Sequence, residues 1–177
     1  MIPDFQSIML PILKIAADKR QRKASEIVAQ ISDQFGLSED ERAERIPSGR
    51  QPLIFNRVHW AITYLVKCGL LERPSRGVVQ LTARGDSVLA TNPERIDLKY
   101  LSRFPEYAEF VAPSDKGLEA KATSKAAEAL STSSLTPDER LRSAHNEINS
   151  ALKTELLARV LSQSPAFFEQ LVVDLLV

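Results

Sequence analysis

Cysteine and histidine are scarce in this sequence of 177 residues, which has one cysteine, Cys68, and two histidines, His59 and His145. A single cysteine excludes a disulfide framework and a zinc knuckle, and the two histidines lie far apart in the sequence. These residues therefore predict no metal site. We interpret Cys68 as a small core residue, because no neighbouring pattern would make it a nucleophile.

Long hydrophobic runs are also missing. No apolar stretch approaches the roughly 18–20 residues that would span a bilayer. The first four residues, Met-Ile-Pro-Asp, lack the basic-then-apolar layout of a signal peptide. Because hydrophobic residues still make up 44% of the chain, a core can form. We expect a cytoplasmic protein without a membrane partner.

The chain has no net charge, with 23 basic and 23 acidic side chains. This balance excludes a uniformly basic coat for nucleic acid and an acidic disordered tail. Charge is nevertheless uneven, because residues 42–84 hold eight basic and two acidic side chains, a net charge of +6. The basic ones are Arg42, Arg45, Arg50, Arg57, Lys67, Arg73, Arg76 and Arg84. Such a block indicates one face that meets an anion.

Hydrophobic spacing predicts three helices in the first third of the chain. They cover residues 5–17, 25–35 and 53–67, and residues 37–52 form a helical turn followed by a loop. Pro11 either kinks the first helix or delays its start. In the second helix we expect Ser25 as the N-terminal cap, Phe35 on the inner face and Gly36 as the stop.

A β-hairpin is predicted after the third helix. Residues 70–73 and 78–82 have the character of short strands, and Pro74-Ser75-Arg76-Gly77 forms the turn between them. Thr82 then caps a short helix that reaches residue 89. Three helices followed by a hairpin is the order of a winged helix-turn-helix, in which the third helix enters the major groove and the wing touches the DNA backbone beside it.

The remainder divides into a poorly patterned part and a helical part. Residues 93–111 are interpreted as irregular, with one short helix near 98–104. Residues 113–134 lack aromatic residues and are interpreted as a linker. The capping box Thr136-Pro137-Asp138-Glu139 opens a new helix, and Ser164-Pro165 opens another. Because the last helix ends on an uncovered apolar face, we infer a fragment in which a second domain is only beginning.

The third helix supplies most candidate DNA-binding residues. Arg57 and Asn56 lie near its start, where arginine can pair with guanine and asparagine with adenine at roughly 1–3 kcal/mol each. Asn56 has the alternative role of bracing the preceding loop. Thr63 and Lys67 lie on the same arc, with Lys67 better suited to a phosphate than to a base.

Other candidate site residues lie elsewhere on that helix or in the segments next to it in the sequence. Trp60 is on the polar arc, although burial is the favoured interpretation for both Trp60 and Tyr64. His59 is assigned a packing role. The expected phosphate contacts outside the helix are Arg50, Arg73 and Arg76.

An ordered set of motifs resembles the N-terminal domain of the Mrr-type restriction endonucleases. The motifs are Pro47-Ser48-Gly49-Arg50-Gln51, Asn56-Arg57-Val58-x-Trp60-Ala61-x-x-Tyr64-Leu65, Gly69-Leu70-Leu71, Arg76-Gly77 and Leu81-Thr82-x-x-Gly85. Two later motifs resemble that family's inter-domain helix and the first helix of its catalytic domain, namely Leu135-Thr136-Pro137-Asp138-Glu139 and Ser164-Pro165-Ala166-Phe167-Phe168-Glu169-x-Leu171-Val172. The resemblance implies an enzyme that binds double-stranded DNA through a winged helix, cuts it with a Mg²⁺-dependent PD-(D/E)xK domain, and restricts methylated foreign DNA.

This resemblance divides the chain into three parts. Residues 1–92 correspond to the winged-helix domain, 93–134 to an extension and flexible linker, and 135–177 to the inter-domain helix and an incomplete nuclease domain. The resemblance also implies a homo-oligomer in the full-length protein. Glu169 is the one matched nuclease-helix residue, and the remaining catalytic residues are absent, so we expect this chain by itself to be inactive.

Two other functions stay open at this point. A winged-helix transcription regulator would need a dimer interface and an effector domain. A winged-helix protein-interaction domain would use Trp60 and Tyr64 as its contact surface, but the basic block weighs against it because interface cores are depleted in charge.

Overall fold

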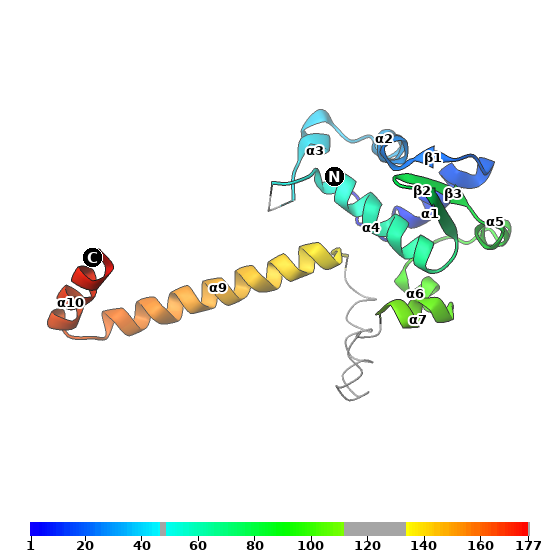
Figure 1. Ribbon diagram of the computed structural model, residues 1–177. Coiled ribbons are helices and arrows are strands. Elements are labelled where there is room, and N and C mark those ends of the chain that lie inside the picture. Colours follow the sequence, from blue (N-terminus) through cyan, green and yellow to red (C-terminus); the bar gives the residue numbers. More distant parts are fainter. Residues whose placement is uncertain (47–48, 112–133, 177) are drawn as a thin grey trace. The chain divides into compact units, whose positions relative to one another are not determined.

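The computed structural model describes residues 1–46, 49–111 and 134–176 (Figure 1). The chain divides into two compact units, Met1–Thr136 and Pro137–Val177, which we treat separately. The predicted linker at residues 113–134 lies almost entirely outside the described residues.

Short helices make up most of the first unit. They are α1 (Met9–Ile15), the 3-10 helix η1 (Ala16–Asp18), α2 (Ala24–Gln34), α3 (Glu39–Ala43), α4 (Leu53–Lys67), α5 (Ala83–Ala90), α6 (Leu98–Leu101) and α7 (Pro105–Val111). One hydrophobic core joins α1, α2 and α4, with fully buried side chains that include Ile12, Ile31 and Leu65. The helix predicted for residues 53–67 is confirmed as α4.

The start of the chain shows why Pro11 is tolerated. Helix α1 begins at Met9, so Pro11 is its third residue and the missing N–H belongs to the first turn, where no intrahelical partner exists. The delayed start, rather than a kink, is therefore the correct alternative.

Helix α2 differs from the prediction at both ends. Lys23 occupies the cap position without a side-chain cap, and the Ala24 N–H donates to the Gly77 carbonyl over 2.8 Å. Ser25 is exposed, so the predicted Ser25 cap is wrong; pairing with the distant Gly77 sets the helix start instead. Phe35 is 37% exposed and is not an inner-face residue. Gly36 ends the helix in the left-handed region (φ +59°), as predicted.

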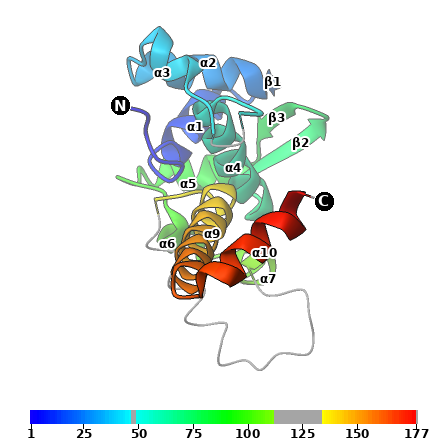
Figure 2. The same ribbon diagram turned by 90° about the vertical axis from the view of Figure 1, so that its left-hand side faces the viewer.

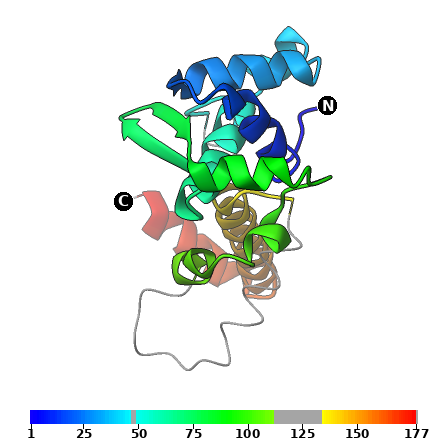
Figure 3. The same cartoon turned by 90° about the vertical axis from the view of Figure 1, so that its right-hand side faces the viewer.

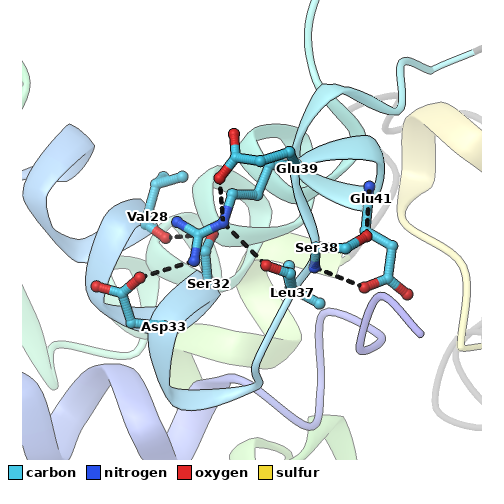
Figure 4. A network of polar contacts seen from close by, with 8 residues as sticks. Val28, Ser32, Asp33, Leu37, Ser38, Glu39 and Glu41 are labelled. Atoms are coloured by element: carbon cyan, nitrogen blue, oxygen red, sulfur yellow. Dashed lines mark hydrogen bonds and ion pairs between the residues drawn. The ribbon is translucent and has the colours of Figure 1, made fainter.

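Polar contacts hold α3 against the end of α2. Ser38 caps α3 by accepting from the Glu41 N–H, and the Glu41 carboxylate accepts from the Ser38 N–H (Figure 4). Arg42 donates to the Leu37 carbonyl and forms an ion pair with Asp33 at 2.7 Å. This network fixes the path of the chain toward α4.

A three-stranded antiparallel sheet lies beside the helices. Its strands are β1 (Arg22–Lys23), β2 (Leu71–Ser75) and β3 (Val78–Leu81), in the order β1-β3-β2. The hairpin of β2 and β3 projects beside α4 (Figure 2, Figure 3). A register shift interrupts the pairing between Glu72 and Ser75, and Gly77 closes the turn with φ +76°. The hairpin was predicted, but β2 runs on through Pro74 and Ser75, so the turn is shorter than the predicted Pro74-Ser75-Arg76-Gly77. Strand β1 was not predicted, because two residues carry no readable alternation.

The segments after the hairpin complete the core. Thr82 caps α5 by accepting from the Gly85 N–H over 3.0 Å, as predicted. Helix α6 lies within the predicted short helix, but α7 was missed in a stretch interpreted as irregular. Tyr107 of α7 is buried and its ring lies 6.3 Å from that of Tyr64.

Cys68 is fully buried beneath this packing, as interpreted from the sequence. Burial raises the pKa of its thiol to about 12, with the Glu106 carboxylate as a second cause. Because only the thiolate is nucleophilic, we expect Cys68 to resist alkylation by iodoacetamide at pH 8 and to react once urea unfolds the chain. Mass spectrometry of the adduct measures this, and rapid labelling of the native chain would contradict the buried placement.

The second unit consists of two helices, α9 (Pro137–Leu161) and α10 (Pro165–Leu176), whose starts were both predicted. Their large hydrophobic side chains are exposed, including Ile148, Leu156 and Phe168. None of the helices in the described part of the chain is long and apolar enough to cross a membrane.

Candidate nucleic-acid interface

Helix α4 buries one face and presents a partly exposed ridge on another. Its buried apolar side chains include Ile54, Val58 and Leu65. Phe55, His59 and Thr63 follow each other at intervals of four residues and are only partly buried. Since residues four apart lie on the same helix face, these three side chains form the outer ridge of α4.

The Phe55 and His59 rings of this ridge stack on each other. Their centroids are 3.9 Å apart with planes at 30°, and His59 Nδ1 lies 3.0 Å from the Phe55 carbonyl oxygen. Burial lowers the pKa of the His59 imidazole, partly offset by the bond to the Phe55 carbonyl, and the charge of Arg73 lowers it further. The imidazole is therefore neutral at pH 7, and Phe55 and His59 form an uncharged aromatic pair on the outer ridge.

Thr63 connects the ridge to the hairpin. Its hydroxyl donates to the His59 carbonyl over 2.8 Å and accepts a hydrogen bond from Arg73 Nη2 over 3.1 Å. Arg73 is an exposed residue of β2. This contact holds a cationic strand residue against the outer ridge of α4.

A cleft of about 270 Å³ separates α4 from the hairpin and the start of α2. His59, Arg73 and Arg76 line it with polar groups, and Ala24, Ile62 and Val79 give it apolar walls. We call this the cationic cleft. Its guanidinium groups and apolar walls match an anion attached to an apolar group, which is the character of a sugar–phosphate backbone.

A second, shallower hollow of about 200 Å³ lies along the outer ridge itself. Its lining residues are Gln51, Phe55, Asn56, His59, Trp60 and Thr63. We call this the aromatic hollow. It shares His59 with the cationic cleft, so the two depressions adjoin each other on one surface.

Several predicted site residues gather here, and others do not. Thr63, Arg73 and Arg76 surround His59 as described. Arg50 is exposed in the loop before α4, and Lys67 is exposed with its Nζ 5.4 Å from the Phe110 ring centroid. Neither Arg50 nor Lys67 lines the cleft or the hollow.

Asn56 and Arg57 have surroundings that differ from the predicted base-reading role. Asn56 is only 4% exposed, and its Oδ1 accepts from the Thr136 hydroxyl over 3.1 Å. Arg57 Nη1 donates to the carbonyls of Ile2 and Pro3 over 3.1 and 3.0 Å. Segments far away in the sequence cover this side of α4, so here both residues brace the fold. The partner of Asn56 is Thr136 and not the loop before α4, which the alternative role had named.

Some basic side chains of residues 42–84 are paired with acidic residues elsewhere and add no free positive charge to this surface. Arg42 is paired with Asp33, and Arg84 is paired with Glu106 at 2.7 Å. The positive charge beside the outer ridge therefore comes mainly from the hairpin, through Arg73 and Arg76.

Trp60 and Tyr64 pack against other aromatic side chains, in line with the burial that was the favoured interpretation for both. Tyr64 is 3% exposed, and its ring stacks 5.7 Å from Phe5. Trp60 is half-buried, with its ring 6.2 Å from that of Tyr64. Trp60 still forms part of the aromatic hollow.

Residues 5–91 match the family described as the Mrr N-terminal domain. The chain carries an Mrr N-terminal domain. It is also 33% identical over 180 residues to the type IV methyl-directed restriction enzyme EcoKMrr of Escherichia coli strain K12. That alignment covers 99% of this chain and 58% of the relative, so the chain spans little more than half of the relative's length. No solved structure gave a match.

The Mrr N-terminal domain contains every residue of the cationic cleft and the aromatic hollow. Sequence reasoning missed Phe55 and His59 as site residues, because both were placed with the apolar arc of the helix. Their spacing of four residues from each other and from Thr63 is the signal that would have grouped them on one exposed line.

Glu169, the single matched nuclease-helix residue, lies outside this domain on α10 and is exposed. Within the described residues, no three His, Cys, Asp or Glu side chains come together in a way that could hold a metal ion. The residues present thus do not fit a Mg²⁺ site, and we derive no step through this ion.

Proposed function

We propose that the first unit is a winged-helix domain that binds double-stranded DNA in a restriction system directed at methylated DNA. The observation that carries the proposal is the cationic cleft, which places Arg73 and Arg76 of the hairpin beside the outer ridge of α4. The element order α1-η1-β1-α2-α3-α4-β2-β3 and the strand order β1-β3-β2 support a winged helix-turn-helix.

In this proposal α4 reads the major groove while the hairpin grips the backbone. A helix with its side chains is about 10–12 Å wide, which matches a major groove of about 12 Å. The outer ridge would face base edges, and Arg73 and Arg76 would contact phosphates of the adjacent strand. Arg50, exposed ahead of α4, would add a further phosphate contact.

A second part of the proposal concerns the helices α9 and α10. Its basis is the relative, a restriction enzyme of which this chain spans 58%. We propose that α9 and α10 are the inter-domain helix and the beginning of a PD-(D/E)xK nuclease domain, completed by residues that this sequence does not contain. Such a nuclease would use Mg²⁺ and act as a homo-oligomer to cut both strands.

Salt dependence tests the DNA-binding proposal. Each phosphate neutralised by a cation contributes about −0.9 to the slope of log affinity against log salt concentration. With Arg50, Arg73 and Arg76 as contacts, we expect a slope of about −2.7 for a 30-base-pair duplex between about 50 and 200 mM NaCl. Fluorescence anisotropy measures it. Absence of binding at the lowest salt, or an affinity that does not change with salt, would contradict the proposal and favour a protein-interaction domain.

A further inference from the structure

We propose that the aromatic hollow receives a methyl group on the major-groove edge of a DNA base, with Phe55 as the residue that contacts it. This inference rests on the proposed DNA-binding function and assigns methyl recognition to one place on α4.

Among the described residues, Phe55 is not counted with the hydrophobic core or with the side chains packed against it. It is only partly buried. Its ring contacts His59 of the same helix instead. Phe55 is therefore a partly exposed phenylalanine in a hollow that shares His59 with the cationic cleft. This pair of neighbouring depressions suits a ligand that has both an apolar group and negative charge, as a methylated duplex does.

The walls of the hollow suit a methyl group surrounded by polar base edges. Phe55, His59 and Trp60 supply aromatic surface, and the neutral His59 ring adds no charge that would need solvation. Gln51 and Thr63 supply amide and hydroxyl groups for hydrogen bonds to the base. The hollow has a volume of about 200 Å³. Arg73, bound to Thr63 at 3.1 Å, provides the adjacent backbone contact.

The same methyl group is present on two modified bases, 5-methylcytosine and N6-methyladenine. A methyl group on C5 of cytosine and one on N6 of adenine both project into the major groove, where unmodified cytosine and adenine present their amino groups. Burying one methyl group is worth about fourfold in affinity. The hollow therefore predicts preference for a methylated duplex over the same unmodified sequence.

The test uses one mixed-sequence duplex of about 30 base pairs in three forms: unmodified, with every cytosine 5-methylated, and with every adenine N6-methylated. We expect the whole 177-residue chain to bind at least one methylated form about fourfold or more tightly than the unmodified form. Phe55→Ala should bring that ratio close to 1, and His59→Gln, which removes the opposite ring, should lower it independently. Thermal melting followed by circular dichroism shows that each variant is folded.

Phe35→Ala is the matched control, because Phe35 is also a partly exposed aromatic side chain but lines neither depression. It should keep the methyl preference of the parent. Equal binding of all three duplexes by the parent chain, or a preference that survives both Phe55→Ala and His59→Gln, overturns the methyl assignment and leaves DNA binding standing. Absence of binding to every duplex overturns the proposed function together with the inference.

Discussion

Replacing Arg73 and Arg76 together by glutamine is expected to weaken duplex DNA binding by roughly 10- to 100-fold, or about 1.4–2.8 kcal/mol. Both guanidinium groups line the cationic cleft. Charge-assisted hydrogen bonds to phosphate are among the strongest polar contacts, and glutamine keeps a polar hydrogen-bonding group but removes the charge. The same double variant should make the salt slope shallower by about 2, since two phosphate contacts are lost.

Anisotropy titrations at several salt concentrations measure both quantities. Arg95→Gln is the matched control, because Arg95 is an exposed arginine paired with Asp97 at 3.6 Å and lies outside both depressions. It should change affinity less than twofold. If the double variant binds with the parent's affinity and slope, the cationic cleft is not the backbone contact and the hairpin is not a DNA-binding wing.

Gly85→Ala is expected to destabilise the first unit by about 3 kcal/mol or more. An added Cβ would lie 2.2 Å from the Leu70 carbonyl oxygen and 2.7 Å from Leu81 Cδ1. The backbone cannot retreat easily, because the Thr82 hydroxyl that caps α5 also donates to the Gly69 and Leu70 carbonyls over 2.7 and 3.0 Å. The first turn of α5 is thus pinned against the end of α4 and the start of β2.

Thermal melting should show a fall of roughly 10 °C or more for this variant. Ser87→Ala, an exposed substitution on the same helix, is the comparison and should leave the melting temperature nearly unchanged. A Gly85→Ala chain that melts within about 2 °C of the parent would show that α5 can move away from Leu70 at little cost. A shift of α5 would also move Arg84, which donates to the Cys68 carbonyl over 2.9 Å.

Features that depend on neighbouring residues could be predicted well. The apolar spacing of residues 53–67 defines α4, the turn at Arg76-Gly77 joins the predicted hairpin, and Thr82 defines the start of α5. Each of these depends on backbone preferences or on contacts within about four residues. The cationic character of the hairpin was predicted for the same reason.

Features that depend on distant residues could not be predicted. Strand β1 forms only because residues 22 and 23 pair with β3. Helix α7 is held by packing on α4 and not by a pattern of its own. Arg57 was assigned to bases because a helical projection places it on a polar arc, but its partners, Ile2 and Pro3, are 55 and 54 residues away.

The sequence by itself therefore determined the segments with a clear pattern of their own, α4, the β2–β3 hairpin and the start of α5. It also determined which residues carry the positive charge and which family residues 1–92 resemble. Tertiary structure alone decided which face of α4 is available. It covered Asn56 and Arg57 with distant segments, left Phe55 and His59 partly exposed, and placed His59 in the same cleft as Arg73. The physical reason is that periodicity identifies the polar and apolar faces of a helix, whereas long-range packing decides which polar face meets solvent.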